Sequence, residues 1–302
     1  MTGPEKEIRG RFAAAGVRGW LHAVRIEPAR IDPAAAPEPE VAVAADDRVV
    51  MASVYKLPLL VAFCRAVDEG MLDPVAPVRL LPEARTTGPT GIAAMSDPVT
   101  MSLRDVARSM ITVSDNAAAD ALLDAVGLPR VHDTLRALGL QATSVRGGTR
   151  DVYDALVRDT RAASLADAMA RLADNDRPVD PAAFDPLLSS ATTARDMTRL
   201  LTAIWTDAAA SPGQCGYMRT VLGQQVWPHR LAAGFPRPGV QVAGKTGTLG
   251  PLRHEVGVVQ YRDEPPVAVA VFTRAARAEI HLPAVDAVIG SAARVAVGTL
   301  RV

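Results

Sequence analysis

Residues 51–70 read MASVYKLPLLVAFCRAVDEG, and their apolar positions recur at spacings of three and four. This spacing predicts an amphipathic helix over 54–69. Ser53 and Lys56 stand at its start, three residues apart, so their side chains share one face. A helix start places free N–H groups and a positive dipole beside the hydroxyl. Because a nearby amine of lowered pKa can take the hydroxyl proton, the stretch predicts an activated serine nucleophile.

The pattern around this stretch divides the chain into three parts. Helical periodicity runs from about residue 51 to 205, with segments predicted at 54–69, 103–112, 117–126, 131–138, 164–173 and 194–205. Strand patterns precede it at 19–27 and 41–50, and follow it at 240–247, 254–261 and 267–274, before a closing helix over 283–300. We therefore predict a discontinuous sheet domain, 1–50 with 218–302, an inserted all-helical domain, 51–217, and an active site between them.

Composition excludes several classes of protein. The 302 residues carry 33 Lys+Arg against 33 Asp+Glu, so the chain lacks the basic charge of a nucleic-acid or membrane-surface binder. Two cysteines, Cys64 and Cys215, cannot form a disulfide scaffold. The histidines lack the spacing of zinc pairs, and His254-Glu255 fails the H-E-x-x-H pattern because Val258 takes the last position.

Two further motifs contain residue types that are scarce in this chain. Ser114-Asp115-Asn116 lies between two predicted helices, and on its own it is typical of an N-cap. Lys245-Thr246-Gly247 ends a predicted strand, and on its own it is typical of a turn. The chain has only three lysines, Lys6, Lys56 and Lys245. Lys56 belongs to the Ser53 motif, and Lys245 belongs to the motif at 245–247.

Taken together and in this order, the three motifs resemble the signature set of class A β-lactamases and related penicillin-binding proteins. The resemblance runs nearly end to end and includes TTARDMTRLL at 192–201 and RHEVGVVQY at 253–261. It implies an α+β fold of the β-lactamase/transpeptidase type, with an antiparallel sheet flanked by helices and an inserted all-helical domain. It also implies a serine hydrolase that needs no cofactor and no metal.

The resemblance implies a role for each motif residue. Ser53 would be acylated, Lys56 would be its base, Ser114 would relay protons to the leaving nitrogen, and Lys245 would set the positive potential. The backbone N–H groups of Ser53 and Thr248 would form the oxyanion hole. Asn116 would hold a substrate amide, and Thr246 would hold a carboxylate with help from Arg253. The residues implied to bind substrate are thus Asn116, Thr246, Gly247, Thr248 and Arg253.

One departure from the family concerns deacylation, which in class A β-lactamases uses an Ω-loop glutamate. No Glu occurs here between Glu83 and Glu255. The possible substitutes are Asp151 and Asp154, with Asp159 further on, although such charge-rich runs usually form an exposed helix face. We therefore expect slow deacylation of penicillins.

Three alternatives share some of these residues. Residues 239–246 match the P-loop pattern G-x-x-x-x-G-K-[ST], but a strand and a Gly/Pro turn surround it where a nucleotide site needs a helix start. An acyltransferase or esterase of a biosynthetic pathway would keep every motif. A penicillin-binding acyl sensor would also keep them and would differ only in turnover.

The expected partner is a small molecule, namely a β-lactam, ester or amide with a carboxylate, and we expect a monomer. MTGPEKEIRG at the start has no apolar segment typical of a secretory signal, and the longest apolar run, 57–64, is too short to span a bilayer. We therefore expect a cytoplasmic protein that meets neither nucleic acid nor membrane.

Overall fold

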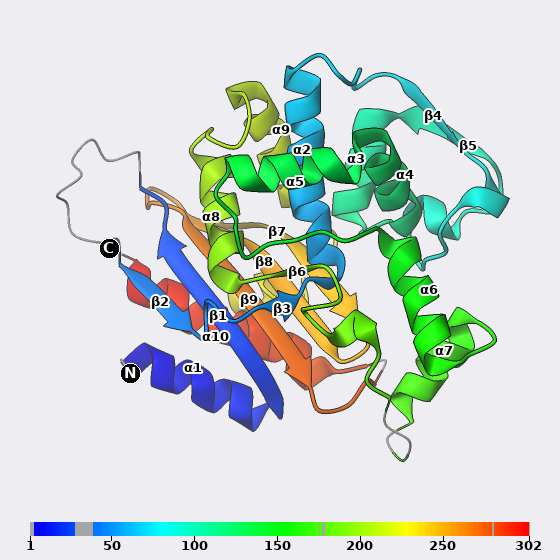
Figure 1. Ribbon diagram of the computed structural model, residues 1–302. Coiled ribbons are helices and arrows are strands. Elements are labelled where there is room, and N and C mark those ends of the chain that lie inside the picture. The colour runs from blue at the N-terminus through cyan, green and yellow to red at the C-terminus, as the bar shows by residue number, and fades with distance from the viewer. Residues whose placement is uncertain (1–2, 28–38, 175, 177–178, 280, 302) are drawn as a thin grey trace.

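A five-stranded antiparallel sheet forms the centre of the computed structural model, which describes residues 3–27, 39–174, 176, 179–279 and 281–301 (Figure 1). The strand order is β2-β1-β9-β8-β7. The strands are β1 (Val17–Arg25), β2 (Glu40–Val43), β7 (Val240–Leu249), β8 (Leu252–Tyr261) and β9 (Val267–Ala275). The first and last parts of the chain thus share one sheet, and the predicted α+β fold is confirmed.

Helices cover both faces of the sheet, which explains why β8 and β9 are buried along most of their length. Helices α1 (Gly3–Ala14) and α10 (Pro283–Leu300) pack on one face, where Ile8 and Phe12 join the valines of β9 in one apolar cluster. Helix α8 (Ala194–Trp205) packs on β1, β8 and β9 from the other face.

The helical part surrounds α2 (Lys56–Asp68), ten of whose thirteen residues are buried. Its neighbours are α3 (Leu103–Thr112), α4 (Asn116–Val126), α5 (Leu128–Ala137) and α9 (Pro212–Gly223). Helices α6 (Thr149–Thr160) and α7 (Leu165–Ala173) extend to one side (Figure 1). Two short ribbons complete the fold, β3 (Val49–Val50) with β6 (Ala191–Thr192) and β4 (Pro77–Leu80) with β5 (Val99–Ser102).

Some element boundaries differ from those that the sequence pattern predicts. The single strand predicted over 41–50 is two strands in different sheets, because the chain turns at Ala44, whose φ is +47°. Helices α1 and α9 lack a strong apolar periodicity and were not predicted. The predicted domain boundary at 217/218 falls inside α9.

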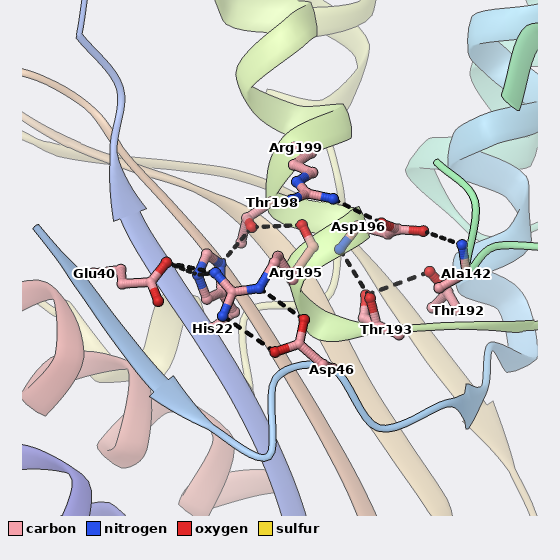
Figure 2. A network of polar contacts seen from close by, with 10 residues as sticks. All are labelled: His22, Glu40, Asp46, Ala142, Thr192, Thr193, Arg195, Asp196, Thr198 and Arg199. Carbon is pink, nitrogen blue, oxygen red and sulfur yellow. Dashed lines mark hydrogen bonds and ion pairs between the residues drawn. The ribbon is translucent and has the colours of Figure 1, made fainter. Parts of the chain in front are cut away.

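A polar network joins α8 to the sheet (Figure 2). The ring nitrogens of the buried His22 on β1 lie 2.6 Å from Thr198 Oγ1 and 2.9 Å from Glu40 Oε2. Arg195 at the start of α8 donates to Glu40 and to Asp46. These contacts fix the N-terminus of α8 and, with it, the strand β6 that directly precedes the helix.

Helix α10 has the length and mean hydropathy, 18 residues and 1.2, of a membrane span, and it is the one such helix among the residues that the structure describes. It packs on β9, on α1 and on the short 3₁₀ turn η5 (Ala232–Gly234), and half of it is buried. Its apolar face is therefore accounted for by packing inside the fold.

The contact between α10 and η5 requires glycine. A Cβ built on Gly290 would lie 2.3 Å from the carbonyl oxygen of Arg230 and 2.7 Å from the backbone nitrogen of Gly234. These neighbours are backbone atoms, which cannot rotate away as a side chain can. The contact fixes the backbone of Arg230, which lines the cavity described below.

We expect Gly290→Ala to lower the free energy of unfolding by about 1–3 kcal/mol, the usual cost of overpacking. Gly298→Ala on the same helix is the matched control, because a Cβ there meets nothing within 4 Å. It should raise stability by about 0.5–1 kcal/mol through helix propensity. Urea unfolding of both variants measures the difference, and equal effects would contradict the packing argument.

Candidate active site

Ser53 lies in a 3₁₀ turn, η1 (Ala52–Tyr55), that leads directly into α2. Residues three apart eclipse each other in such a turn, so Ser53 and Lys56 point to the same side. Ala52 before the serine has a φ of +45°, a strained value for a residue with a Cβ. The chain is held there by a hydrogen bond from Met51 N to Ser190 O of 2.9 Å, so the residue just before β6 supports the position of the serine.

The amine of Lys56 is fully buried and hydrogen-bonded to the turn that contains Ser114. Lys56 Nζ donates to Ser114 O at 2.7 Å and to Asn116 Oδ1 at 2.9 Å, and it lies 3.4 Å from Ser114 Oγ. Burial lowers the pKa of Lys56 to about 7, against the opposing charges of Asp115 and Asp120. Near neutral pH a large fraction of this amine is therefore unprotonated and able to accept a proton.

The turn between α3 and α4 presents Ser114 to both lysines. Ser114 has a φ of +59°, and its Oγ accepts a hydrogen bond from Lys245 Nζ at 2.9 Å. The neighbouring Asp115 is buried and structural, since its carboxylate caps α4 and accepts from Ile92 N at 2.6 Å and Ser109 Oγ at 2.7 Å. The hydrogen bonds of Asp115 thus hold the strained turn in place.

Lys245 on β7 is the second fully buried amine of the site. Burial, and then the nearby charge of Lys56, lower the pKa of Lys245 well below its ordinary value. Behind it, Thr246 N donates to Gln225 Oε1 and Gln225 Nε2 donates to Glu255 Oε1, both at 2.7 Å. Burial raises the pKa of Glu255 to about 7.

A cavity of about 370 Å³ opens in front of these groups. Its lining includes Ser53, Ser114, Asn116, Tyr153, Thr246 and Thr248, with Trp227, His229 and Arg230 at one side. A smaller recess of about 40 Å³ adjoins it between Ser53 and α6. Strand β7 comes very close to η1, since a Cβ on Gly247 would lie 2.9 Å from Met51 O. The structure therefore brings Ser53, Lys56, Ser114, Asn116, Lys245, Thr246, Gly247 and Thr248 into one site.

Comparisons with known proteins agree with this geometry. The model of the beta-lactamase enzyme family matches residues 34–300. The chain belongs to this family. It is 30% identical to the beta-lactamase regulatory protein BlaB of Streptomyces cacaoi, over 84% of this chain and 86% of that protein.

Solved beta-lactamase-fold structures cover nearly the whole chain. The beta-lactamase of Sphaerobacter thermophilus DSM 20745 has a TM-score of 0.75 at 23% identity, over 98% of this chain and 96% of that one. A point mutant of PBP-A, solved as an acyl-enzyme complex with penicillin G, has a TM-score of 0.75 at 19% identity, over 99% and 96%. At these identities the two structures establish the fold alone.

Arg253 does not take the place that the sequence resemblance implies. Its buried guanidinium donates to the carbonyl oxygens of Leu252 at 2.9 Å and Glu279 at 3.1 Å, and it does not line the cavity. Arg230 lines the cavity instead and donates to Thr248 Oγ1 at 2.8 Å and Gly247 O at 2.9 Å. It comes from an irregular segment, so no periodicity or motif in the sequence could have indicated it.

The two aspartates considered for deacylation also lie outside the cavity. Successive helix residues point about 100° apart, so α6 can present only one face to Ser53, and that face carries Thr149, Val152 and Tyr153. Asp151 accepts from Gly148 N at 2.8 Å and closes the start of α6, while Asp154 is exposed. The structure therefore corrects their assignment as deacylation residues.

Tyr153 is a site residue that the sequence analysis missed. Its hydroxyl accepts a hydrogen bond from Asn116 Nδ2 at 2.9 Å, and burial raises the pKa of its phenol. Asn116 Nδ2 also donates to Thr87 O at 3.2 Å, while its Oδ1 accepts from Lys56. A substrate amide that binds Asn116 must therefore compete with Tyr153.

The P-loop alternative is wrong, because residues 240–249 form a continuous strand that turns directly into β8. No helix start is available there to hold phosphate. Across the described residues, no group of three His, Cys, Asp or Glu side chains is placed to hold a metal ion.

The lowered pKa of Lys56 can be measured directly, because the chain has only three lysines. In protein labelled with ¹³C-lysine, we expect the Cε signal that disappears in Lys56→Arg to titrate with a midpoint of about 7. Desolvation of the ammonium form is the cause, so urea should move the midpoint up toward the ordinary value of a lysine. A midpoint above 9 in the folded protein would contradict the buried amine as a base.

Proposed function

We propose that Ser53 is acylated by a carboxylate-bearing β-lactam, ester or amide, and that the resulting acyl-enzyme breaks down slowly. One observation carries this proposal. The site has a serine with two buried amines behind it, but of the described residues that line its two adjoining cavities, none is Asp or Glu. The groups for acylation are present, and the carboxylate base for deacylation is missing.

Acylation follows from the arrangement of the amines. The neutral amine of Lys56 takes the proton as Ser53 Oγ attacks the substrate carbonyl. The Lys56 amine lies 3.4 Å from Ser114 Oγ, and Lys245 donates to the same oxygen at 2.9 Å, so the proton can pass through this hydroxyl to the leaving nitrogen or oxygen. The backbone N–H groups of Ser53 and Thr248 would stabilise the oxyanion.

Recognition of a substrate carboxylate falls to β7 and to Arg230, which line the cavity. Thr246 and Thr248 present hydroxyl groups to the cavity, and Arg230 donates a hydrogen bond to Thr248 Oγ1. Arg230 also pairs with Asp286, 2.6 Å away, which fixes its guanidinium. The fixed guanidinium and the two hydroxyl groups together favour substrates with a carboxylate near the scissile bond.

Deacylation lacks a comparable group. Tyr153 occupies the wall next to Ser53, and its raised phenol pKa keeps it protonated at neutral pH, so it cannot act as a base there. General base catalysis typically contributes about 10²–10⁴ in rate. We therefore infer an acyl-enzyme that accumulates.

A protein that acylates and then stops is suited to sensing β-lactams. The similarity to BlaB, which is named a regulatory protein, and to PBP-A, whose mutant was solved as an acyl-enzyme with penicillin G, supports this use. An intracellular esterase or acyltransferase with a smaller acyl group is the second candidate, and turnover of small esters would distinguish it.

We expect a fluorescent penicillin to label wild-type protein and not Ser53→Ala. Lys245→Arg should slow labelling at least tenfold although the charge is kept, because the larger guanidinium does not fit beside Ser114. Intact-mass spectrometry measures both effects. Equal labelling of Ser53→Ala would place the nucleophile elsewhere, and an unchanged rate in Lys245→Arg would leave this lysine a purely structural role.

We expect Tyr153→Glu to release the acyl group faster than wild type, since it places a carboxylate beside Asn116 and Ser53. The gain should approach 10²-fold, the lower range for a general base. Tyr153→Gln is the matched control, because it makes the same space without a base. Stopped-flow measurement of the burst and steady state with a chromogenic cephalosporin separates the two steps. Equal acceleration in both variants would show that space alone limits deacylation.

A further inference from the structure

A separate cavity, of about 120 Å³, lies at the end of the sheet, where β1, β8 and β9 meet β3 and residues 184–186. Three arginines line it: Arg18, Arg48 and Arg274. Trp20, Phe184 and Leu252 supply apolar walls. None of the described residues that line this arginine recess is Asp or Glu, so the arginines are the charged side chains of its wall.

The three cations are held close together by the fold. Arg18 and Arg274 are direct cross-strand partners in the register of β1 and β9, a placement that destabilises a sheet unless an anion offsets the repulsion. Arg18 pairs with Asp47 and Arg274 with Asp180, each at 3.1 Å. Asp47 also accepts from Trp20 Nε1 at 3.1 Å. The side chains of Asp47 and Asp180 are 49% and 82% exposed, so both ion pairs are solvated and an incoming anion can compete with them.

Arg48 adds a third positive charge. It donates to the Ser144 hydroxyl at 3.0 Å, and because this hydroxyl is neutral, the hydrogen bond does not balance the charge of Arg48. It enters from the segment before β3, across the recess from the sheet. An incoming anion can therefore be approached by guanidinium groups from two sides, an arrangement that suits carboxylate oxygens.

The wall of the recess also contains His254, which is 1% exposed. Thr273 N donates to its Nδ1 at 3.2 Å, so Nδ1 holds a lone pair and Nε2 carries the proton of the neutral ring. Burial lowers the pKa of His254 to about 3, and the ring is therefore neutral. The Val50 carbonyl is near enough to raise that pKa, but Nε2 makes no hydrogen bond of normal geometry to any of the described residues. A buried donor without an acceptor is rare in native proteins.

We propose that the arginine recess binds a small organic anion: a carboxylate held by the three arginines and His254, on a short apolar or aromatic body packed against Trp20, Phe184 and Leu252. A closed cavity of ~150 Å³ admits benzene in another protein. This recess of about 120 Å³ is smaller but has exposed arginines at its edge, so it has room for a short chain or for a ring that stays partly outside. Val50 lines both this recess and the one beside Ser53. A bound anion would therefore lie directly behind the strand that leads to the serine.

Benzoate is a suitable probe, and the three tryptophans report where it binds. Trp20 lines the arginine recess, Trp227 lines the cavity in front of Ser53, and Trp205 lines neither. In ¹⁵N-tryptophan protein we expect benzoate to shift the indole signal of Trp20 saturably. Benzamide, which has the same shape without the charge, should leave that signal in place.

Arg48→Gln and Arg274→Gln should each weaken this binding roughly tenfold or more, the effect of removing a hydrogen bond to a charged group. Arg262→Gln is the matched control, since Arg262 is exposed at the opposite end of β8. A benzoate response confined to Trp227, an equal response to benzamide, or unchanged affinity in both recess variants would overturn the proposal. Binding at Trp20 is independent of acylation at Ser53, so its failure would leave the proposed function standing.

Discussion

Two lysine amines buried side by side around one serine hydroxyl are the constraint on which the rest of the structure depends. Lys56 and Lys245 are both 0% exposed, and both bond to Ser114. Burying a charged amine is strongly unfavourable, and two adjacent ones repel each other as well. The pair can persist because burial lowers the pKa of both amines, which reduces the charge that must be buried, and because the site supplies acceptors for their N–H groups.

Each half of the molecule supplies carboxylate charge that stabilises the charged form of one amine. Asp115 and Asp120 on the helical side favour the charged form of Lys56, and both are also caps, at the starts of α4 and α6. Glu255 on the sheet side does the same for Lys245 and is linked to Thr246 through Gln225. The groups that balance the charges are thus the ones that hold α4, α6 and β7 in place, so the electrostatics of the site and its geometry cannot change independently.

The sequence indicates those site residues that belong to short motifs. Ser53 with Lys56 depends on one helical turn, Ser114 with Asn116 on one N-cap and Lys245 with Thr246 on one strand, so each pair is visible locally. Arg230 and Tyr153 are not visible in this way, because they reach the cavity from an irregular segment and from a helix whose facing side depends on its rotation. Asp151 was misplaced for the same reason: its carboxylate turns back to cap its own helix. Helix and strand identities follow from periodicity, whereas α1 buries only Ile8 and Phe12 and gives too weak a pattern to detect.

The missing glutamate also helps to explain the low pKa of Lys56. A carboxylate next to a buried amine raises the pKa of that amine, because the opposite charge stabilises the ammonium form. With the phenol of Tyr153 against Asn116, no such charge faces Lys56 from α6, and its pKa stays at about 7. Lys56 is therefore a better proton acceptor for the first step than it would be beside a glutamate, while the second step loses its base. A site built this way favours formation of an acyl-enzyme over its breakdown, and the substitution that restores breakdown should at the same time raise the pH at which acylation begins.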